Sequence, residues 1–411
     1  MPATRPAFPI EIRASARHRL GMPPARFLRD YWQKRPLLVR NAFPDFAPPL
    51  SPDDLAGLAC MEGALARIVM HAPPARRAAR TPRHHNDGNW TLRSGPFDDA
   101  TFAKLPERDW TLLVQDVDKW DTDTAGLLDH FDFIPSWRID DVMISYAADR
   151  GGVGAHVDQY DVFLLQGLGQ RRWSIDARPD PPTAFRDDVE LKLLREFRPS
   201  HTWLLESGDM LYLPPGVPHD GVADGECTTF SIGMRAPAAG ELLFDFAAHV
   251  AETLPECRRF ADPDLRPAQN AGEIDADALR RARRTLGAVA AVLGDDAFAD
   301  WFGTFITRYR AARVATPRTR PIDRAQLATR LAQARFHRDP WSRFAWRKRG
   351  RAARLYVAGQ GFDAPIAWAR ELASGAREFP GQSLAKLPQA AGGIALLASL
   401  IDAGHLNLKR R

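Results

Sequence analysis

Short apolar runs separated by turn residues fill the stretch from Trp110 to Pro237. They are WTLLVQDV, DVMISYA, VFLLQGL, RRWSID, HTWLLES, DMLYLP and TTFSIGMRA. Runs of this length, with Gly-Gly and Pro-Pro-Gly between them, are typical of a β-barrel or sandwich and not of alternating βαβ units. Earlier in the chain, residues 23–40 predict a short helix followed, after Pro36, by an apolar strand.

The apolar pattern changes to a helical period after Pro237. The helical segments are ELLFDFAAHVAETL, ALRRARRTLGAVAAVLG and AFADWFGTFITRYRAARV. The Pro-containing stretch TPRTRPID then precedes a mixed segment, with a helix over 325–334, strands around FAWRK and RLYVAG, and a final apolar helix, IALLASLIDAG. This order predicts a winged-helix-like module. The predicted domains are therefore 1–237, 238–316 and 317–411.

Composition limits the possible classes of protein. A chain of 411 residues is longer than one hydrophobic core usually supports, and 45% hydrophobic with 26% charged residues is ordinary for a globular protein. No run approaches 18 apolar residues and the first twenty lack a signal-peptide core, so we expect a cytoplasmic protein without a membrane partner. The three cysteines are far apart, which disfavours disulfides and thiolate zinc sites. A metal would need His and carboxylate ligands.

Such ligands occur within the β-rich stretch. His156 and Asp158 are two residues apart in GGVGAHVDQYDVFLL, and on an extended strand they would point to the same face. His219 follows a Pro-Pro-Gly turn that closes a later strand. Two histidines and one carboxylate leave coordination positions open, which suits iron(II) chemistry with an oxo-acid and dioxygen, whereas structural zinc sites are closed by four ligands. We predict these three residues as metal ligands and catalytic residues, although H-x-D alone is too short to exclude ordinary barrel residues.

An oxo-acid cosubstrate needs a cationic anchor. Arg171 and Arg172 lie on the strand after the H-x-D segment, and arginine pairs with carboxylates through two parallel hydrogen bonds. Because alternate residues of a strand face opposite sides, one arginine should enter the barrel and the other should meet solvent. The alternation does not say which.

Longer segments around these residues carry a more specific pattern. They are PSWRIDDVMISYAADRGGVGAHVDQYDVFLLQGLGQRRWSI, GDMLYLPPGVPHDGV and FSIGMRAP, with FLRDYWQKRPLLVRNAF and SPDDLAGLACMEG nearer the start. In them the chain closely resembles the bacterial JmjC-type ribosomal oxygenases, which hydroxylate an arginine of the large-subunit ribosomal protein L-sixteen. The resemblance implies an α+β protein: a double-stranded β-helix of the JmjC/cupin-like jelly-roll type, then a helical dimerisation region and a C-terminal winged-helix-like domain.

The resemblance also assigns roles to residues. It implies that His156, Asp158 and His219 bind Fe(II), that Arg171 binds the distal carboxylate of 2-oxoglutarate, and that Ser145 lies in the same cosubstrate pocket. Candidates for contact with the substrate arginine are few and lie near these motifs: Tyr160 and Asp161 of the Q-Y-D run, with Asp140 and Asp220 as further possibilities.

The implied activity is that of a 2-oxoglutarate- and Fe(II)-dependent protein hydroxylase. It would use dioxygen, release succinate and carbon dioxide, take a ribosomal protein as its partner and form a homodimer. A cupin-type metalloenzyme is an alternative, because Gly208 to His219 fits the second cupin motif. The first cupin motif, however, expects H-x-H followed by Glu, so the H-x-D pair favours the oxygenase.

A non-catalytic ribosome- or nucleic-acid-binding protein is the other alternative, given the net charge of +5 and pI near 9.3. Two basic segments bear on it, Pro73–His85 and Arg343–Arg354. We favour a solvated loop for the first and a charged wing for the second, because no recognition helix with base-reading residues is evident. Direct nucleic-acid binding is therefore not expected.

Overall fold

The computed structural model describes residues 8–72, 86–256, 259–263, 265, 274–290 (without the side chains of 288–290), 294–310, 312–388 and 392–409. It divides into two compact units, Met1–Ala236 and Pro237–Arg411. The further division expected at residue 316 stays a prediction. The basic segment 73–85 and Cys257 lie outside the described residues.

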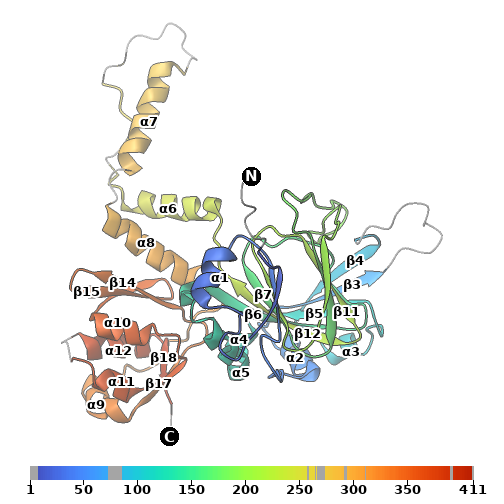
Figure 1. Ribbon diagram of the computed structural model, residues 1–411. Helices are drawn as coiled ribbons and strands as arrows, with labels where there is room; N and C mark the ends of the chain where they lie inside the picture. The colour runs from blue at the N-terminus through green and yellow to red at the C-terminus, as the bar shows by residue number, and fades with distance from the viewer. Residues whose placement is uncertain are drawn as a thin grey trace, which may run out of the picture. The chain divides into compact units, whose positions relative to one another are not determined.

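The first unit is built on two β-sheets whose strands are mainly antiparallel (Figure 1). Its strands are β1 Glu11–Arg13, β2 Leu37–Arg40, β3 Ala66–Ala72, β4 Asn89–Ser94, β5 Trp110–Val114, β6 Ile139–Ala147, β7 Val162–Gln166, β8 Gln170–Ile175, β9 His201–Leu205, β10 Met210–Leu213, β11 His219–Asp224 and β12 Cys227–Met234. The nine-stranded sheet has the order β1-β2-β10-β7-β12-β6-β5-β3-β4, and the three-stranded sheet has the order β11-β8-β9. Only the β1–β2 pair is parallel among these strands. This is the predicted jelly roll.

The helices of the first unit are short. They are α1 Pro24–Asp30, α2 Pro52–Ala59, α3 Asp99–Phe102, α4 Val117–Trp120 and α5 Thr122–Gly126, with 3-10 turns at Leu127–Phe131 and Ser136–Arg138. Helix α1 buries Phe27 completely, with its ring centroid 4.9 Å from that of Tyr212 on β10 and 5.7 Å from that of Phe163 on β7. The predicted helix and strand over residues 23–40 are thus confirmed, and they anchor the large sheet.

All the apolar runs predicted as strands between Trp110 and Pro237 are strands. One expectation in this region is wrong: His156 and Asp158 do not lie on a strand of either sheet but in the loop between β6 and β7, where His156 forms only an isolated bridge to His219. Strand β11, with the sequence HDGVAD, was not predicted because it has no apolar run. Its backbone is nevertheless paired along its whole length with β8.

The second unit combines helices with two small three-stranded sheets. The helices are α6 Ala239–Thr253, α7 Ala276–Ala290, α8 Asp295–Arg308, α9 Arg324–Arg330, α10 Ile366–Leu372, α11 Gly381–Ala385 and α12 Gly393–Asp402, with a 3-10 turn at Leu331–Gln333. The strands are β13 Arg335–Arg338, β14 Phe344–Arg349, β15 Ala352–Val357, β16 Gln360–Ala364, β17 Glu378–Pro380 and β18 Leu406–Leu408. Their sheet orders are β17-β13-β18 and β14-β15-β16. In the described part of the chain, no helix is both long and apolar enough to cross a bilayer.

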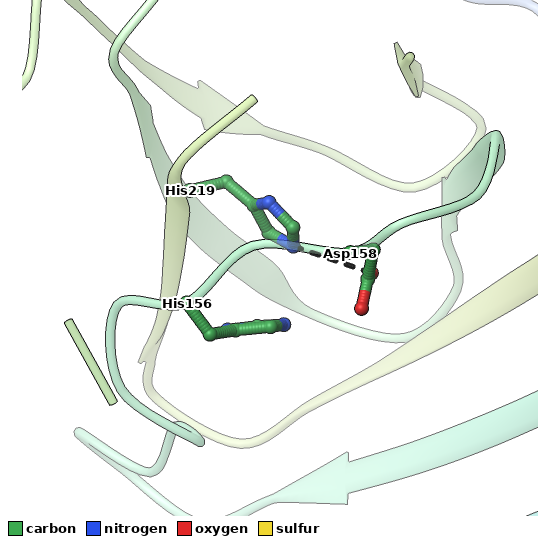
Figure 2. A group of neighbouring side chains, drawn as sticks. All are labelled: His156, Asp158 and His219. Atoms are coloured by element: carbon green, nitrogen blue, oxygen red, sulfur yellow. Dashed lines mark ion pairs between the residues drawn. The ribbon is translucent and has the colours of Figure 1, made fainter. Parts of the chain in front are cut away.

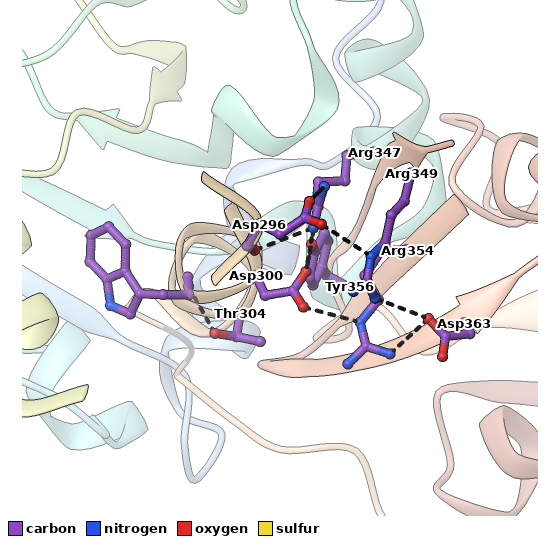
Figure 3. A network of polar contacts seen from close by, with 9 residues as sticks. Asp296, Asp300, Thr304, Arg347, Arg349, Arg354, Tyr356 and Asp363 are labelled. Atoms are coloured by element: carbon purple, nitrogen blue, oxygen red, sulfur yellow. Dashed lines mark hydrogen bonds and ion pairs between the residues drawn. The ribbon is translucent and has the colours of Figure 1, made fainter. Parts of the chain in front are cut away.

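Helix α8 is fixed to the β14–β16 sheet by close packing and by a polar network (Figure 3). A Cβ on Gly303 would lie 2.5 Å from the ring of Tyr356, so only glycine permits this approach. Asp300 accepts hydrogen bonds from the Tyr356 hydroxyl (2.6 Å) and from Arg347 (2.9 Å), and Arg347 also pairs with Asp296 (2.9 Å). The basic run Arg343–Arg354 is therefore partly neutralised within the protein, as expected of a structural wing.

Candidate metal and cosubstrate site

The candidate site lies between the two sheets of the first unit. In the paired strands β8 and β11, Arg171, Trp173 and His219 share one face, because residues directly opposite in an antiparallel pair point the same way. Gly221 shares that face, and a Cβ there would lie 2.7 Å from the indole of Trp173. A glycine at this position leaves room for the indole beside His219, whose ring centroid is 5.9 Å away.

The structure brings His156, Asp158 and His219 together, although His219 is distant in sequence. Figure 2 shows the three side chains pointing toward a common space. Ligand atoms of all three lie within 4.8 Å of one another, and Nε2 of His219 is 3.7 Å from Oδ2 of Asp158. This separation leaves space for one ion bound by all three groups. It is the only such group of His, Cys, Asp or Glu side chains among the described residues.

Backbone contacts orient the two imidazoles. Nδ1 of His156 lies 2.8 Å from the carbonyl oxygen of Gly154, and Nδ1 of His219 lies 2.9 Å from that of Val217. With Nδ1 donating to a carbonyl, Nε2 is the free nitrogen on each ring and can bind a metal. Burial, and then the neighbouring His156, lowers the pKa of His219 to about 4. His219 is therefore neutral at pH 7, the form that coordinates metals.

Backbone hydrogen bonds hold the main chain of the loop that carries Asp158. The amide of Gly216, in the Pro-Pro-Gly turn before His219, donates to the backbone oxygen of Asp158 over 2.7 Å. His156 and His219 also exchange two backbone hydrogen bonds of 3.0 Å each. These bonds bring the loop and the turn together, which explains how residues outside any strand are held in place.

Asn86 is a buried residue that the sequence did not single out. Its side-chain amide donates to the carbonyl oxygens of Ala155 and Leu194, each over 2.9 Å, and its Oδ1 accepts from the amide of Ala155 over 2.7 Å. Gly154, with φ of +78°, lies so close that a Cβ would be 2.8 Å from this oxygen. Asn86 therefore fixes the chain immediately before His156.

Replacing Asn86 with alanine should weaken metal binding by about 10- to 100-fold, the usual effect of removing a group that supports a metal ligand. The reason is that the buried amide of Ala155 would lose its partner and the His156 loop would shift. Titration with Co(II), followed by its visible absorption, measures the change. Asn89→Ala is the matched control, because Asn89 is an exposed residue three positions along. Equal Co(II) affinity in both variants would contradict the prediction.

Arg171 is the arginine that enters the barrel, and Arg172 is the one that meets solvent. Arg171 is 5% exposed, whereas Arg172 pairs at the surface with Asp224 over 2.8 Å. Nη1 of Arg171 donates to Oγ of the buried Ser145 over 3.4 Å, and its Nε and Nη2 have no hydrogen-bond partner among the described residues. A buried guanidinium without a carboxylate is costly, so this arrangement fits a site for a bound anion.

The two candidates of the Q-Y-D run lie in different surroundings. Tyr160 is 39% exposed, and its pKa is raised by burial of its hydroxyl and then by the negative charge of Asp158. Asp161 is fully buried; it accepts hydrogen bonds from the hydroxyl of Tyr212 over 2.6 Å and from Nε2 of Gln33 over 2.9 Å. The expectation that Asp161 contacts substrate does not agree with this enclosure. Its carboxylate instead joins the end of the Asp158 loop to β10 and the N-terminal segment.

The further acidic candidates, Asp140 and Asp220, are also paired or buried within the protein. Asp140 accepts a hydrogen bond from the buried Arg235 over 2.7 Å. Asp220 is 3% exposed and lies next to His219 on β11, so its side chain points to the opposite face of that strand. Of the residues considered for substrate contact, Tyr160 has the surroundings that suit the role best.

The jelly roll, the His-Asp-His group and the buried arginine together define a JmjC domain, and residues 126–242 match the family model of that domain. Residues 279–407 match the ROXA-like winged helix. The chain is 35% identical over 314 residues to "Ribosomal protein uL16 3-hydroxylase" of Escherichia coli (strain K12), covering 75% of this chain and 77% of that protein. It is 38% identical over 221 residues to a "Probable ribosomal oxygenase" of Haemophilus influenzae, covering 54% and 51%.

Comparison with solved structures indicates the same family and covers more of the chain. The X-ray structure of E. coli YcfD superposes with a TM-score of 0.80 at 31% identity, covering 95% of this chain and 99% of that one. A structure of YcfD, a ribosomal oxygenase, in complex with cobalt and 2-oxoglutarate superposes with a TM-score of 0.77 over the same shares. The chain belongs to the JmjC ribosomal oxygenase family. This membership favours the oxygenase over the cupin-type alternative.

Proposed function

We propose that the protein is a 2-oxoglutarate- and Fe(II)-dependent hydroxylase of an arginine side chain on ribosomal protein L-sixteen, active in the cytoplasm. The observation that carries the proposal is the pairing of a three-ligand group with a buried arginine whose Nε and Nη2 have no partner among the described residues. The E. coli relative, named for 3-hydroxylation of the ribosomal protein, supports the choice of substrate.

The residues of the site fit both Fe(II) and 2-oxoglutarate. His156, Asp158 and His219 would hold the metal from one side, which leaves positions for a cosubstrate and dioxygen. Arg171, assisted by Ser145, would bind the far carboxylate of 2-oxoglutarate. When bound, Fe(II) and 2-oxoglutarate would supply the oxidising power, with one oxygen atom of O2 going into the substrate C–H bond and the other into succinate as carbon dioxide is released.

The protein's own residues position the reactants. The inner faces of the two sheets exclude water from the cosubstrate pocket, since Ser145, Arg171 and Trp173 are all buried. The partly exposed Tyr160 is proposed to lie against the substrate guanidinium, where an aromatic ring is favourable for a cation. Burial and the charge of Asp158 keep this phenol protonated.

Mass spectrometry of ribosomal proteins tests the proposal. Cells lacking the protein should lose a mass increment of about 16 Da, one oxygen atom, from an arginine-containing peptide of ribosomal protein L-sixteen. With Fe(II) and 2-oxoglutarate, the purified protein should form succinate in the presence of that peptide. If the iron-loaded protein binds the ribosomal protein but never turns over, a non-catalytic binding protein becomes the better description.

We also propose that the helical segment of the second unit forms a homodimer. Leu242, Phe246, Phe298 and Trp301 contribute to an apolar cavity of about 370 Å³ between α6 and α8. Leu243, which also lines this cavity, and the following residue Phe244 are 68% and 79% exposed. Exposed apolar groups of this size are typical of surfaces that are covered by another chain, and closed two-fold dimers are the commonest assemblies.

The double substitution Leu243→Glu and Phe244→Glu should convert the dimer to a monomer, because it would place charges in an apolar interface. Sedimentation equilibrium measures the mass. Glu252→Gln, an exposed change on the same helix, should leave the mass of the dimer unchanged. A monomeric native protein, or a double variant that still dimerises, would contradict this proposal.

A further inference from the structure

Charge is distributed unevenly along this chain. Residues 317–411 contain 18 Lys and Arg against six Asp and Glu, a net charge of +12. Residues 1–316 contain 38 against 45, a net charge of −7. If arginine were enriched uniformly along the chain, both parts would have a net charge of the same sign. The basic pI therefore comes from the C-terminal part alone, and a local excess of this size favours a polyanionic partner.

Most of the charge of the β14–β15 wing is already paired, and the exposed Lys348 and Arg351 are the exceptions. Arg347 pairs with Asp296 and Asp300, both over 2.9 Å, and Arg354 pairs with Asp363 over 3.2 Å (Figure 3). These guanidinium groups already have carboxylate partners within the second unit. A polyanion would have to displace those carboxylates before it could bind Arg347 or Arg354.

Another basic segment, Arg318–Arg335, lacks carboxylate partners of this kind. It contains five exposed arginines that form no ion pair with any residue that the structure describes: Arg318, Arg320, Arg324, Arg330 and Arg335. Its only acidic residue, Asp323, accepts hydrogen bonds from the amides of Ala325 and Gln326 and so caps α9. The segment therefore keeps most of its positive charge available to a partner.

The backbone of the Arg318–Arg335 segment is held firmly while its arginines face solvent. The amides of Arg318 and Ile322 donate to the backbone and side-chain oxygens of Asp402, over 2.8 and 2.7 Å. Leu327 and Leu331 are buried and anchor α9 and the turn after it. In Figure 1, α9 lies at the opposite end of the C-terminal part from the β14–β15 hairpin. The segment is thus a rigid surface separate from the wing.

We propose that the Arg318–Arg335 segment binds the phosphate backbone of RNA. The choice of RNA rests on the proposed function, because a ribosomal protein is assembled together with RNA. The absence of a base-reading helix from the sequence argues against sequence-specific recognition but not against phosphate contacts, which need only exposed cations. The segment would then help the enzyme to reach its substrate within an RNA-protein particle.

Fluorescence anisotropy with a labelled RNA hairpin tests the proposal on the full-length protein. The variant R318Q/R320Q/R324Q/R330Q/R335Q removes the five charges, and R13Q/R17Q/R93Q/K104Q/R108Q removes five exposed charges from the first unit as a control. The first variant should bind at least about tenfold more weakly at 0.1 M salt, with a shallower salt dependence, since each lost phosphate contact removes about 0.7–0.9 from the log–log slope. The control should bind like the native protein.

Three results would overturn the RNA assignment: no binding by the native protein, equal losses in both variants, or equal affinity for vesicles containing anionic phospholipid. A separate readout keeps the proposed function distinct. The five-arginine variant should form succinate normally with a free ribosomal-protein peptide and more slowly with assembled particles. If the native protein binds RNA through this segment but never hydroxylates the peptide, the proposed function fails and the RNA site stands.

Discussion

The substitution Arg171→Met is expected to raise the KM for 2-oxoglutarate about a hundredfold while leaving metal binding unchanged. Loss of a buried pair between a guanidinium and a carboxylate costs roughly 3 kcal/mol, which corresponds to about two powers of ten in affinity. Arg171 has the required geometry, because it is buried, contacts Ser145 and keeps two nitrogen atoms without a partner among the described residues. Succinate formation at varied 2-oxoglutarate gives KM, and Co(II) titration gives the metal affinity.

A stability measurement separates an anion-binding role for Arg171 from a structural one. If the arginine is held for a ligand, the ligand-free Arg171→Met protein should unfold at the same or a higher temperature, because an uncompensated buried charge has been removed. If the arginine supports the fold, the variant should unfold earlier. Arg172→Met is the matched control, since it lies on the same strand but pairs at the surface with Asp224. An unchanged KM in Arg171→Met would remove the cosubstrate assignment.

The part of the site that could be predicted from the sequence is marked by short local motifs. His156 and Asp158 are two residues apart in one motif, and the Pro-Pro-Gly turn before His219 marks where a strand ends. The three ligands could therefore be predicted, although the prediction that His156 and Asp158 lie on a strand is wrong. Strand alternation predicted that one of Arg171 and Arg172 is buried. Only the resemblance to known oxygenases chose Arg171, and the structure places that residue inside.

The remaining parts depend on contacts between distant segments. Asn86 is 69 residues from Ala155 and 108 from Leu194, and nothing near it in sequence indicates that it will be buried between them. The prediction that Asp161 contacts substrate rested on its place beside the metal motif and on the affinity of a carboxylate for a guanidinium. Its partners Gln33 and Tyr212 lie 128 and 51 residues away, so its enclosure becomes visible only in the folded chain.

The substitution Asp158→Ala is expected to reduce 2-oxoglutarate-dependent turnover by more than about a hundredfold, since loss of a supporting group around a metal already costs 10- to 100-fold and loss of a ligand costs more. Co(II) affinity should fall with it, because the two imidazoles would then face the ion without a carboxylate ligand. Turnover is measured as succinate formed with the ribosomal-protein peptide, and Co(II) binding by its visible absorption.

The fold should survive the loss of the Asp158 side chain. Its loop is tied by the backbone bond from Gly216 to the carbonyl oxygen of Asp158, and by the paired backbone bonds between His156 and His219, none of which involves the carboxylate. The unfolding temperature without metal should therefore stay close to that of the native protein, while the stabilisation that added Co(II) gives should disappear, because a ligand stabilises only a state that binds it. Asp224→Ala, an exposed carboxylate at the end of β11, should keep both turnover and Co(II) stabilisation. Turnover and Co(II) stabilisation that persist in Asp158→Ala would show that Asp158 is not a metal ligand.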